Sequence, residues 1–93
     1  MPDLSVIVPA WNAEKTLALC LEGLMRQTLA LDCYEIIVVD DGSTDQTAEI
    51  ARRFPIVYHY QENQGPATAR NVGVSLAEGD LIFLYRCGLH PGS

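Results

Sequence analysis

Apolar residues recur along this chain in four short runs, and the polar segments between them show helical spacing. The runs are Leu4–Pro9, Glu35–Asp40, Ile56–Gln61 and Leu81–Tyr85. The first, second and fourth are apolar at consecutive positions, which is typical of strands buried on both faces. The third alternates only in part, which favours a strand nearer the edge of a sheet. We therefore expect four strands, the last of them buried up to Leu84.

A helix is expected between each pair of successive strands. Asn12 is a candidate N-cap for the first, which ends near Gln27–Thr28 and carries an apolar face of Leu17, Cys20, Leu21, Leu24 and Met25. Ser43 and Gln46 form a capping box before the second helix, whose narrow stripe is Ala48, Ala51 and Phe54 and which Pro55 stops. Pro66 suits the first turn of the third, Gly79 its end, and its buried face is Ala69, Val72, Gly73 and Leu76.

The resulting order, β-α-β-α-β-α-β, indicates an α/β fold with a Rossmann-like parallel sheet covered on both faces. Such sheets bind ligands beyond the carboxyl ends of their strands. The segments to inspect are therefore 9–14, 40–45, 63–70 and whatever follows Leu84.

Length and charge limit the function. The 93 residues form at most one small domain, and the net charge of −6 gives no support to nucleic-acid binding. No apolar stretch approaches the length of a membrane span or a signal peptide. Three widely spaced cysteines, Cys20, Cys33 and Cys87, are typical of reduced thiols in a cytoplasmic protein, so we expect a cytoplasmic location.

Two strand ends carry side chains suited to chemistry. After the first strand, Trp11 is either a packing residue or a platform for a flat base, and Glu14 either binds a ligand or favours the first turn of its helix. After the second strand, the adjacent carboxylates of Asp40 and Asp41 point to opposite sides if the strand continues through them. They either accept from the ring N–H of uracil and the ribose hydroxyls or shape a turn.

The third strand is followed by Gly65, at the start of a helix with free N–H groups, and by Arg70 one turn later. Arg70 either contacts Asp41 or a nucleotide, or is an ordinary surface residue. Gly73 lies mid-helix, where close helix–sheet packing explains a glycine best. His59 is expected to be structural. The chain has no P-loop, no GxGxxG, no HExxH and no GxSxG motif.

Taken together, the segments LSVIVPAWN, EIIVVDDGSTDQT, NQGPATARNVG and GDLIFL resemble the family 2 glycosyltransferases, which have the GT-A fold. The resemblance covers Leu4 to Leu84. It implies transfer of a sugar, with inversion, from a nucleoside diphosphate sugar, most often a UDP-sugar. The nucleotide-binding residues that it implies are Pro9, Ala10, Trp11, Asn12, Glu14, Asp40, Asp41, Gly42 and Arg70.

The chain departs from this family after Leu84. An Asp-x-Asp pair that holds Mn²⁺ or Mg²⁺ is expected there, but the sequence has Tyr85, Arg86 and Cys87. The family's second half, with its catalytic base, is also missing. We therefore expect residues 1–84 to be the nucleotide-binding half of a truncated GT-A domain and 85–93 to be an irregular tail. No metal ligand and no catalytic residue is assigned in this chain.

Two explanations for the departure stay open: a divergent or truncated fragment, and a reading-frame slip near Leu84. Codons for the residues from Tyr85 to Pro91, read one base later, can encode Thr-Asp-Ala-Asp-Cys-Thr-Pro. The nucleotide sequence of the gene decides between them.

The functional expectation is a glycosyltransferase by family that lacks activity as this chain. The alternative is a non-catalytic nucleotide-binding or self-associating module. Because half a domain leaves apolar surface and a strand edge uncovered, we expect a homodimer or higher oligomer.

Overall fold

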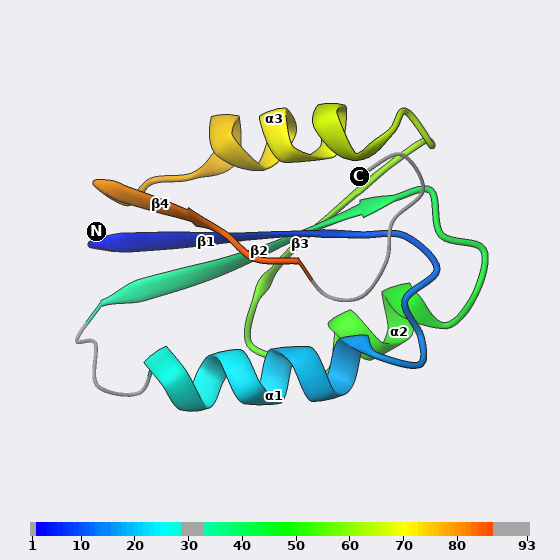
Figure 1. Ribbon diagram of the computed structural model, residues 1–93, viewed down its shortest axis with the longest axis horizontal. Helices are drawn as coiled ribbons and strands as arrows, with labels where there is room; N and C mark the ends of the chain where they lie inside the picture. Colours follow the sequence, from blue (N-terminus) through cyan, green and yellow to red (C-terminus); the bar gives the residue numbers. More distant parts are fainter. Residues whose placement is uncertain (1, 29–32, 87–93) are drawn as a thin grey trace.

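The four apolar runs form one parallel sheet in the computed structural model, which describes residues 2–28 and 33–86 (Figure 1). The elements follow in the order β1 (Leu4–Ala10), α1 (Leu17–Thr28), β2 (Tyr34–Asp41), α2 (Thr47–Ala51), β3 (Val57–Gln61), α3 (Pro66–Leu76) and β4 (Leu81–Leu84). The predicted succession of strands and helices, and the α/β fold class, are confirmed.

The strands lie in the order β3-β2-β1-β4, and every neighbouring pair is parallel. The chain moves outward from β1 to β2 to β3 and then returns to the other side of β1 as β4. The direction of winding therefore reverses between β1 and β4, the position at which open α/β sheets bind their ligands. The expected edge position of β3 is confirmed.

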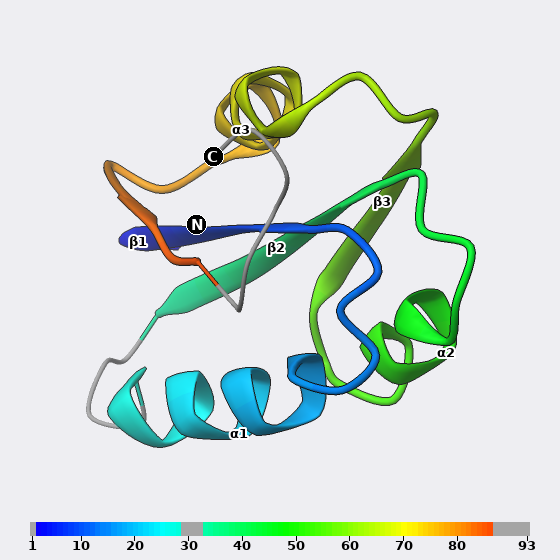
Figure 2. The ribbon, with the colours of Figure 1, turned by 45° about the vertical axis from the view of Figure 1, so that its right-hand side comes forward.

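The helices cover the two faces of the sheet unequally. In Figure 2, α1 and α2 lie on one side of the sheet and α3 on the other. Buried side chains of β1 and β2 pack against α1 and α2 in one core cluster that includes Val6, Val8, Leu17, Leu21, Leu24, Ile36, Val38, Ile50 and Ala51. The smaller cluster beneath α3 consists of Ile7, Ile37, Val39 and Ala69. Burial of this apolar surface is the main force that holds the layers together.

Gly73 allows α3 to approach the sheet closely. A Cβ atom at this position would lie 2.3 Å from Cγ2 of Ile7 and 3.3 Å from Cγ2 of Val39. The prediction that this glycine serves helix–sheet packing is confirmed. The close approach of the helix to the sheet also fits the small size of its buried residues, Ala69 and Gly73.

The start of α1 differs from the prediction. The helix begins at Leu17, after a turn in which the C=O of Ala13 accepts from the N–H groups of Thr16 at 3.1 Å and Leu17 at 2.8 Å. Asn12 is not its N-cap, because the Asn12 side chain instead accepts a hydrogen bond from Thr44 in the loop after β2. The predicted end at Thr28 is confirmed.

The predicted capping box before α2 is also wrong. The helix starts at Thr47, and no side-chain cap bond is made by Gln46. Asp45 instead binds the start of this helix, since its Oδ1 accepts a hydrogen bond from the N–H of Thr47 at 2.9 Å. An aspartate two residues before a threonine offers a stronger acceptor than the serine hydroxyl of the predicted box.

Gly79 does not end α3, which stops at Leu76. It lies against β1, where a Cβ atom would be 2.7 Å from the backbone nitrogen of Ser5, and its N–H donates to Oγ of Ser5 at 2.8 Å. The Ser5 hydroxyl in turn donates to Glu35 of β2. This glycine therefore joins the α3–β4 connection to the amino-terminal edge of the sheet.

The expectation that β4 is buried is wrong for this structure. Its four residues are 46% to 68% exposed, and β4 is an edge strand of the sheet. The ladder to β1 continues past the strand, since the N–H of Tyr85 donates to the C=O of Ile7 at 2.9 Å. The remaining tail residues of the prediction, 87–93, lie outside the described residues.

Two further expectations concern the whole chain. Cys20 is disulfide-bonded, so the expectation of three reduced thiols is wrong at that residue. Among residues 2–28 and 33–86, no helix has the length and apolar character needed to cross a membrane.

Candidate functional site

The loops that follow β1, β2 and β3 meet at the carboxyl end of the sheet, on the right in Figure 1. They comprise residues 11–16, 42–46 and 62–65. We call this set of loops the carboxyl rim. Because the strands are parallel, their carboxyl ends lie at the same edge of the sheet, and the loops that follow them meet there.

The first two loops of the rim are held together by hydrogen bonds between backbone and side chain. The N–H of Asn12 donates to Oγ of Ser43 at 2.8 Å, and the N–H of Thr44 donates to Oδ1 of Asn12 at 2.8 Å. One residue later, the N–H of Ala13 donates to the buried Oγ1 of Thr47 at 2.8 Å. Asn12 thereby adopts a left-handed backbone with a φ of 45°, a conformation that asparagine tolerates better than most residues.

Asp45 adds a charged acceptor to the same junction. One of its oxygens accepts from Thr47, and the other accepts from the N–H of Glu14 at 3.2 Å. Burial by itself raises the pKa of the Asp45 carboxyl, but the hydrogen bonds from Thr47 and Glu14 outweigh it and hold the pKa below its ordinary value. The carboxylate form is therefore the one that stabilises this junction.

Asp41 joins β2 to the loop before α3. Its side chain is completely buried and accepts from Nε2 of Gln61 at 2.9 Å. It also accepts from the N–H groups of Gln64 at 2.8 Å and Gly65 at 2.9 Å. Oε1 of Gln61 is buried without a donor among the described residues, which leaves one acceptor at this end of β3 open to a water or to a ligand's donor.

Asp40 points to the opposite side of β2, as strand alternation predicts. It is completely buried, its Oδ1 accepts from the N–H of Ser43 at 2.9 Å, and its Oδ2 accepts from the hydroxyl of Tyr58 at 2.6 Å. Asp40 therefore shapes the turn after β2, which was one of the two interpretations of this pair, whereas Asp41 fixes the loop before α3. Their contact with a ligand stays a prediction.

The position between these aspartates and Ser43 requires a glycine, Gly42. Its φ is 76°, and a Cβ atom there would lie 2.6 Å from the backbone nitrogen of Asn63. Both the backbone conformation and the close approach to the third loop exclude a side chain. The DDGSTD segment is thus fitted to its neighbours on both sides of the rim.

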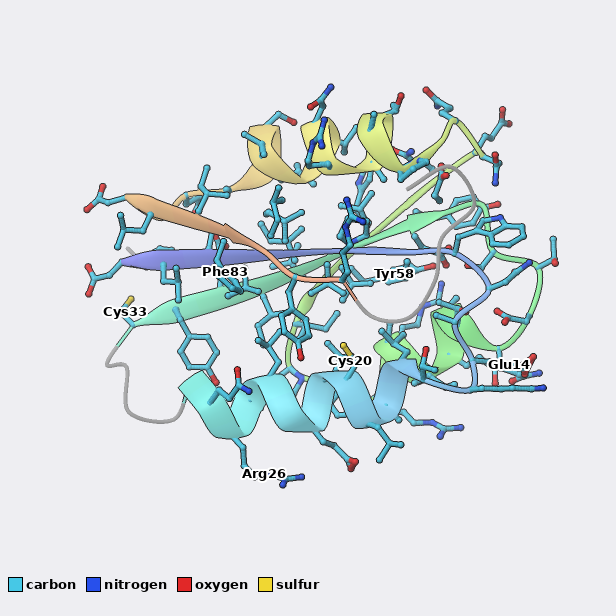
Figure 3. The ribbon with its side chains drawn as sticks, viewed as in Figure 1. Glu14, Cys20, Arg26, Cys33, Tyr58 and Phe83 are labelled. Carbon is cyan, nitrogen blue, oxygen red and sulfur yellow. The ribbon has the colours of Figure 1, made fainter. Side chains whose placement is uncertain are left out.

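The other predicted site residues differ in their exposure. Glu14 and Arg70 are exposed, Pro9 and Trp11 are half-buried, and Ala10 is buried in the core beside α1. In Figure 3, Glu14 lies at the end of the sheet that carries the rim, whereas Arg26 lies near the opposite end of α1. The exposed and half-buried residues are the ones available to a ligand in this structure.

Sequence reasoning missed the residues that brace the rim. These are Asp45, Thr47, Tyr58, Gln61 and the backbone of Gln64. Asp45 and Thr47 carried a usable signal, because the spacing of an aspartate two residues before a threonine favours a local hydrogen bond at a helix start. Tyr58 and Gln61 carried none, since their partners depend on the register between β2 and β3.

A divalent metal, which the resemblance implies, does not fit the residues present. No group of three or more His, Cys, Asp or Glu side chains suited to a metal occurs in the described part of the chain. Directly after β4, the structure has Tyr85 and Arg86, a phenol and a cation in place of hard anionic oxygen ligands. Tyr85 and Arg86, the described residues at this edge, therefore offer no ligand that would clamp a metal to a diphosphate.

Comparison with known proteins identifies the family. The profile of "Glycosyl transferase family 2" matches residues 5–85. The chain is 41% identical to the validoxylamine A glucosyltransferase of Streptomyces hygroscopicus subsp. jinggangensis (strain 5008), over 99% of this chain and 23% of that protein. It is 31% identical to the poly(ribitol-phosphate) beta-glucosyltransferase of Bacillus spizizenii, over 97% of this chain and 15% of that protein. The chain spans 12% to 29% of the length of the curated relatives that it matches.

Solved structures agree with this assignment. S. aureus TarS 1–349 in complex with UDP superposes with a TM-score of 0.82 at 35% identity, over 92% of this chain and 27% of that one. Its complex with UDP-GlcNAc gives a TM-score of 0.79 at 33% identity, over 92% and 26% of the two chains. Mannosyl-3-phosphoglycerate synthase from Rubrobacter xylanophilus, at 20% identity and a TM-score of 0.81, shares the fold.

The parallel sheet, the rim built on the DDGSTD segment and these similarities lead to one conclusion: the chain belongs to glycosyl transferase family 2 and has the GT-A fold.

Proposed function

We propose that this chain is the nucleotide-binding half of a glycosyltransferase that takes a sugar from a UDP-sugar and transfers it with inversion. The observation that carries the proposal is the carboxyl rim, in which three loops are fastened to one another beside the point where the strand order reverses. A TarS fragment of 33–35% identity was solved with UDP and with UDP-GlcNAc, which supports the choice of nucleotide.

The residues on the rim suggest how UDP is held. The half-buried ring of Trp11 offers a face on which a base can stack. Arg70 is exposed in the second turn of α3, where its guanidinium is available to a phosphate or a base oxygen. Pro9 and Gly42 border this surface, and the exposed carboxylate of Glu14 offers an acceptor for ribose hydroxyls and for the ring N–H of uracil.

We further propose that the chain alone transfers no sugar. Transfer in this family draws on a metal at the diphosphate and on a general base, and the residues after β4 do not supply the first. Without a metal at the diphosphate, the donor's leaving group gains no added stabilisation. The expected role of the chain is therefore binding without turnover.

Trp11 gives a direct test, because it is the only tryptophan of the chain. Titration with UDP should quench its fluorescence to saturation. Arg70→Ala should weaken the apparent affinity by about tenfold, the loss expected for a charge-assisted hydrogen bond. Arg26→Ala is the matched control, because it removes an exposed arginine in the last turn of α1, at the end of that helix away from the carboxyl rim. An unsaturable response, or an equal response to CMP and ADP, would contradict the choice of UDP.

A second candidate function is self-association, and a specific surface favours it. The apolar side chains of Leu81, Ile82, Phe83 and Leu84 are exposed on both faces of an edge strand. We propose that a second copy of this chain pairs with β4 in antiparallel orientation about a two-fold axis at Phe83, which keeps both faces of the joined sheet continuous. Pairing along a strand of four residues makes few backbone hydrogen bonds, so the expected dimer is weak and dependent on concentration.

A further inference from the structure

Tyr58 lies in the edge strand β3, away from the loop that carries Trp11, and yet it is linked to that loop. Its half-buried side chain donates from the hydroxyl to Oδ2 of the buried Asp40 at 2.6 Å. The guanidinium of Arg52 lies 5.3 Å from the centre of its ring and helps to hold the ring in place. Figure 3 shows Tyr58 beside the sheet, on the side of α1 and α2.

The link continues from Asp40 through the turn after β2. The second carboxylate oxygen of Asp40 accepts from the N–H of Ser43 at 2.9 Å. The hydroxyl of Ser43 then accepts from the N–H of Asn12 at 2.8 Å, directly after Trp11 in sequence. We call this series, Tyr58 to Asp40 to Ser43 to Asn12, the brace.

Each step of the brace depends on the one before it. A buried carboxylate oxygen that loses its donor carries the cost of an unsatisfied charge, so Asp40 would turn or draw in water. Ser43 would then lose its fixed acceptor, and the left-handed backbone of Asn12 would lose the bonds that maintain it. Burial and the hydrogen bond to Asp40 raise the pKa of the Tyr58 hydroxyl, so it remains a donor at every working pH.

We propose that Tyr58 is a positioning residue for the nucleotide site, which acts through Asp40 and Ser43 to fix the loop of Trp11 and Asn12. Asp40 has the same role, because both of its oxygens are engaged by donors of this chain. The proposal rests on the proposed binding of UDP. It goes beyond that binding proposal because it assigns a role in the affinity for UDP to Tyr58, in a strand outside the loops proposed to contact the ligand.

Tyr58→Phe is the central variant, since it removes the hydroxyl and leaves the ring. Tyr60→Phe is its matched control: this tyrosine lies on the same face of β3, in register with Asp40, and its hydroxyl donates to no group in the described part of the chain. Ser43→Ala breaks the brace further along without disturbing the buried carboxylate. Both Tyr58→Phe and Ser43→Ala should weaken UDP binding by about fivefold, as expected for one lost hydrogen bond.

A second readout needs no nucleotide. Acrylamide quenching of Trp11 fluorescence in the free protein should increase in Tyr58→Phe and in Ser43→Ala, and should be unchanged in Tyr60→Phe. If wild type fails to bind UDP, the proposed function fails, while the quenching still tests the brace. Quenching and UDP affinity that stay at wild-type values in folded Tyr58→Phe would overturn the proposal.

Discussion

The carboxylate of Asp41 accepts a hydrogen bond from the N–H of Gly65 at 2.9 Å, which joins the end of β2 to the residue before α3. Gly65 has a φ of 101°, a backbone conformation that favours glycine. A second backbone N–H, from Gln64, donates to the same side chain. The buried charge thus fixes the third loop of the carboxyl rim directly before α3.

Asp41→Asn should therefore be strongly destabilising. The amide keeps the shape but loses the charge and places an NH₂ group where an acceptor is required. We expect a loss of about 2–4 kcal/mol in the free energy of unfolding, measured by urea denaturation. Asp80→Asn, an exposed aspartate outside the rim, should change stability by less than about 0.5 kcal/mol. Equal stability of the two variants would show that the bonds to Asp41 contribute little.

Gly73 and Gly23 make a matched pair of helix glycines. Gly73→Ala places a methyl group into the side chain of Ile7 and should destabilise the protein by about 1–3 kcal/mol. Gly23→Ala, in α1, meets nothing within 4 Å and should stabilise it by up to about 1 kcal/mol. Thermal unfolding followed by circular dichroism measures both. If both substitutions changed the stability in the same direction, the close approach of α3 to β1 would be contradicted.

Asp45 makes stability depend on pH in a defined direction. Because its pKa is lowered in the folded state, its contribution is complete above the ordinary carboxyl pKa of about 3.9. It is lost as the pH falls through the lowered value. Asp45→Asn should be less stable than wild type at pH 7, and the gap should narrow as the pH falls below 3.8, as followed by urea midpoints over a series of pH values. A gap that stays constant with pH would exclude the charge as its cause.

Phe83 lies at the centre of the proposed pairing between two β4 strands. Phe83→Asp and Phe83→Lys should each abolish the dimer, and an equimolar mixture of the two should restore it, since the two side chains would face each other across the axis. Leu19→Asp, on an exposed position of α1, should leave the dimer intact. Sedimentation velocity over a range of concentrations measures the outcome. Wild type that remains monomeric at the highest concentration would contradict the interface.

Local patterns were enough to predict most of the fold. The consecutive apolar runs predicted the strands, and the order of elements predicted the parallel sheet, because both depend on burial along the chain. Helix starts were less accurate: Asn12 has the residue type of an N-cap, but its side chain binds Thr44 in another loop. Long-range partners of this kind override local propensity.

The site was predicted in its location but only partly in its chemistry. The strand-end rule identified the loops of Trp11, Asp41 and Gly65, yet it gave no sign that both aspartates would be completely buried. Their donors include the side chain of Tyr58, 18 residues away in β3. Such contacts follow from the register between strands, which no pattern within one segment contains. The exposure of β4 likewise depends on what lies beside it in space.

Calorimetric titration of the 93-residue chain with UDP, in Mn²⁺ and again in EDTA, tests the nucleotide-binding role most directly. We expect saturable binding of one UDP per chain, with affinities that agree within about twofold in the two buffers, because the end of β4 offers a metal no hard anionic ligand. Absence of binding at millimolar UDP would contradict the role of the carboxyl rim. Binding that requires Mn²⁺ would contradict the interpretation that the described residues after β4 do not hold a metal.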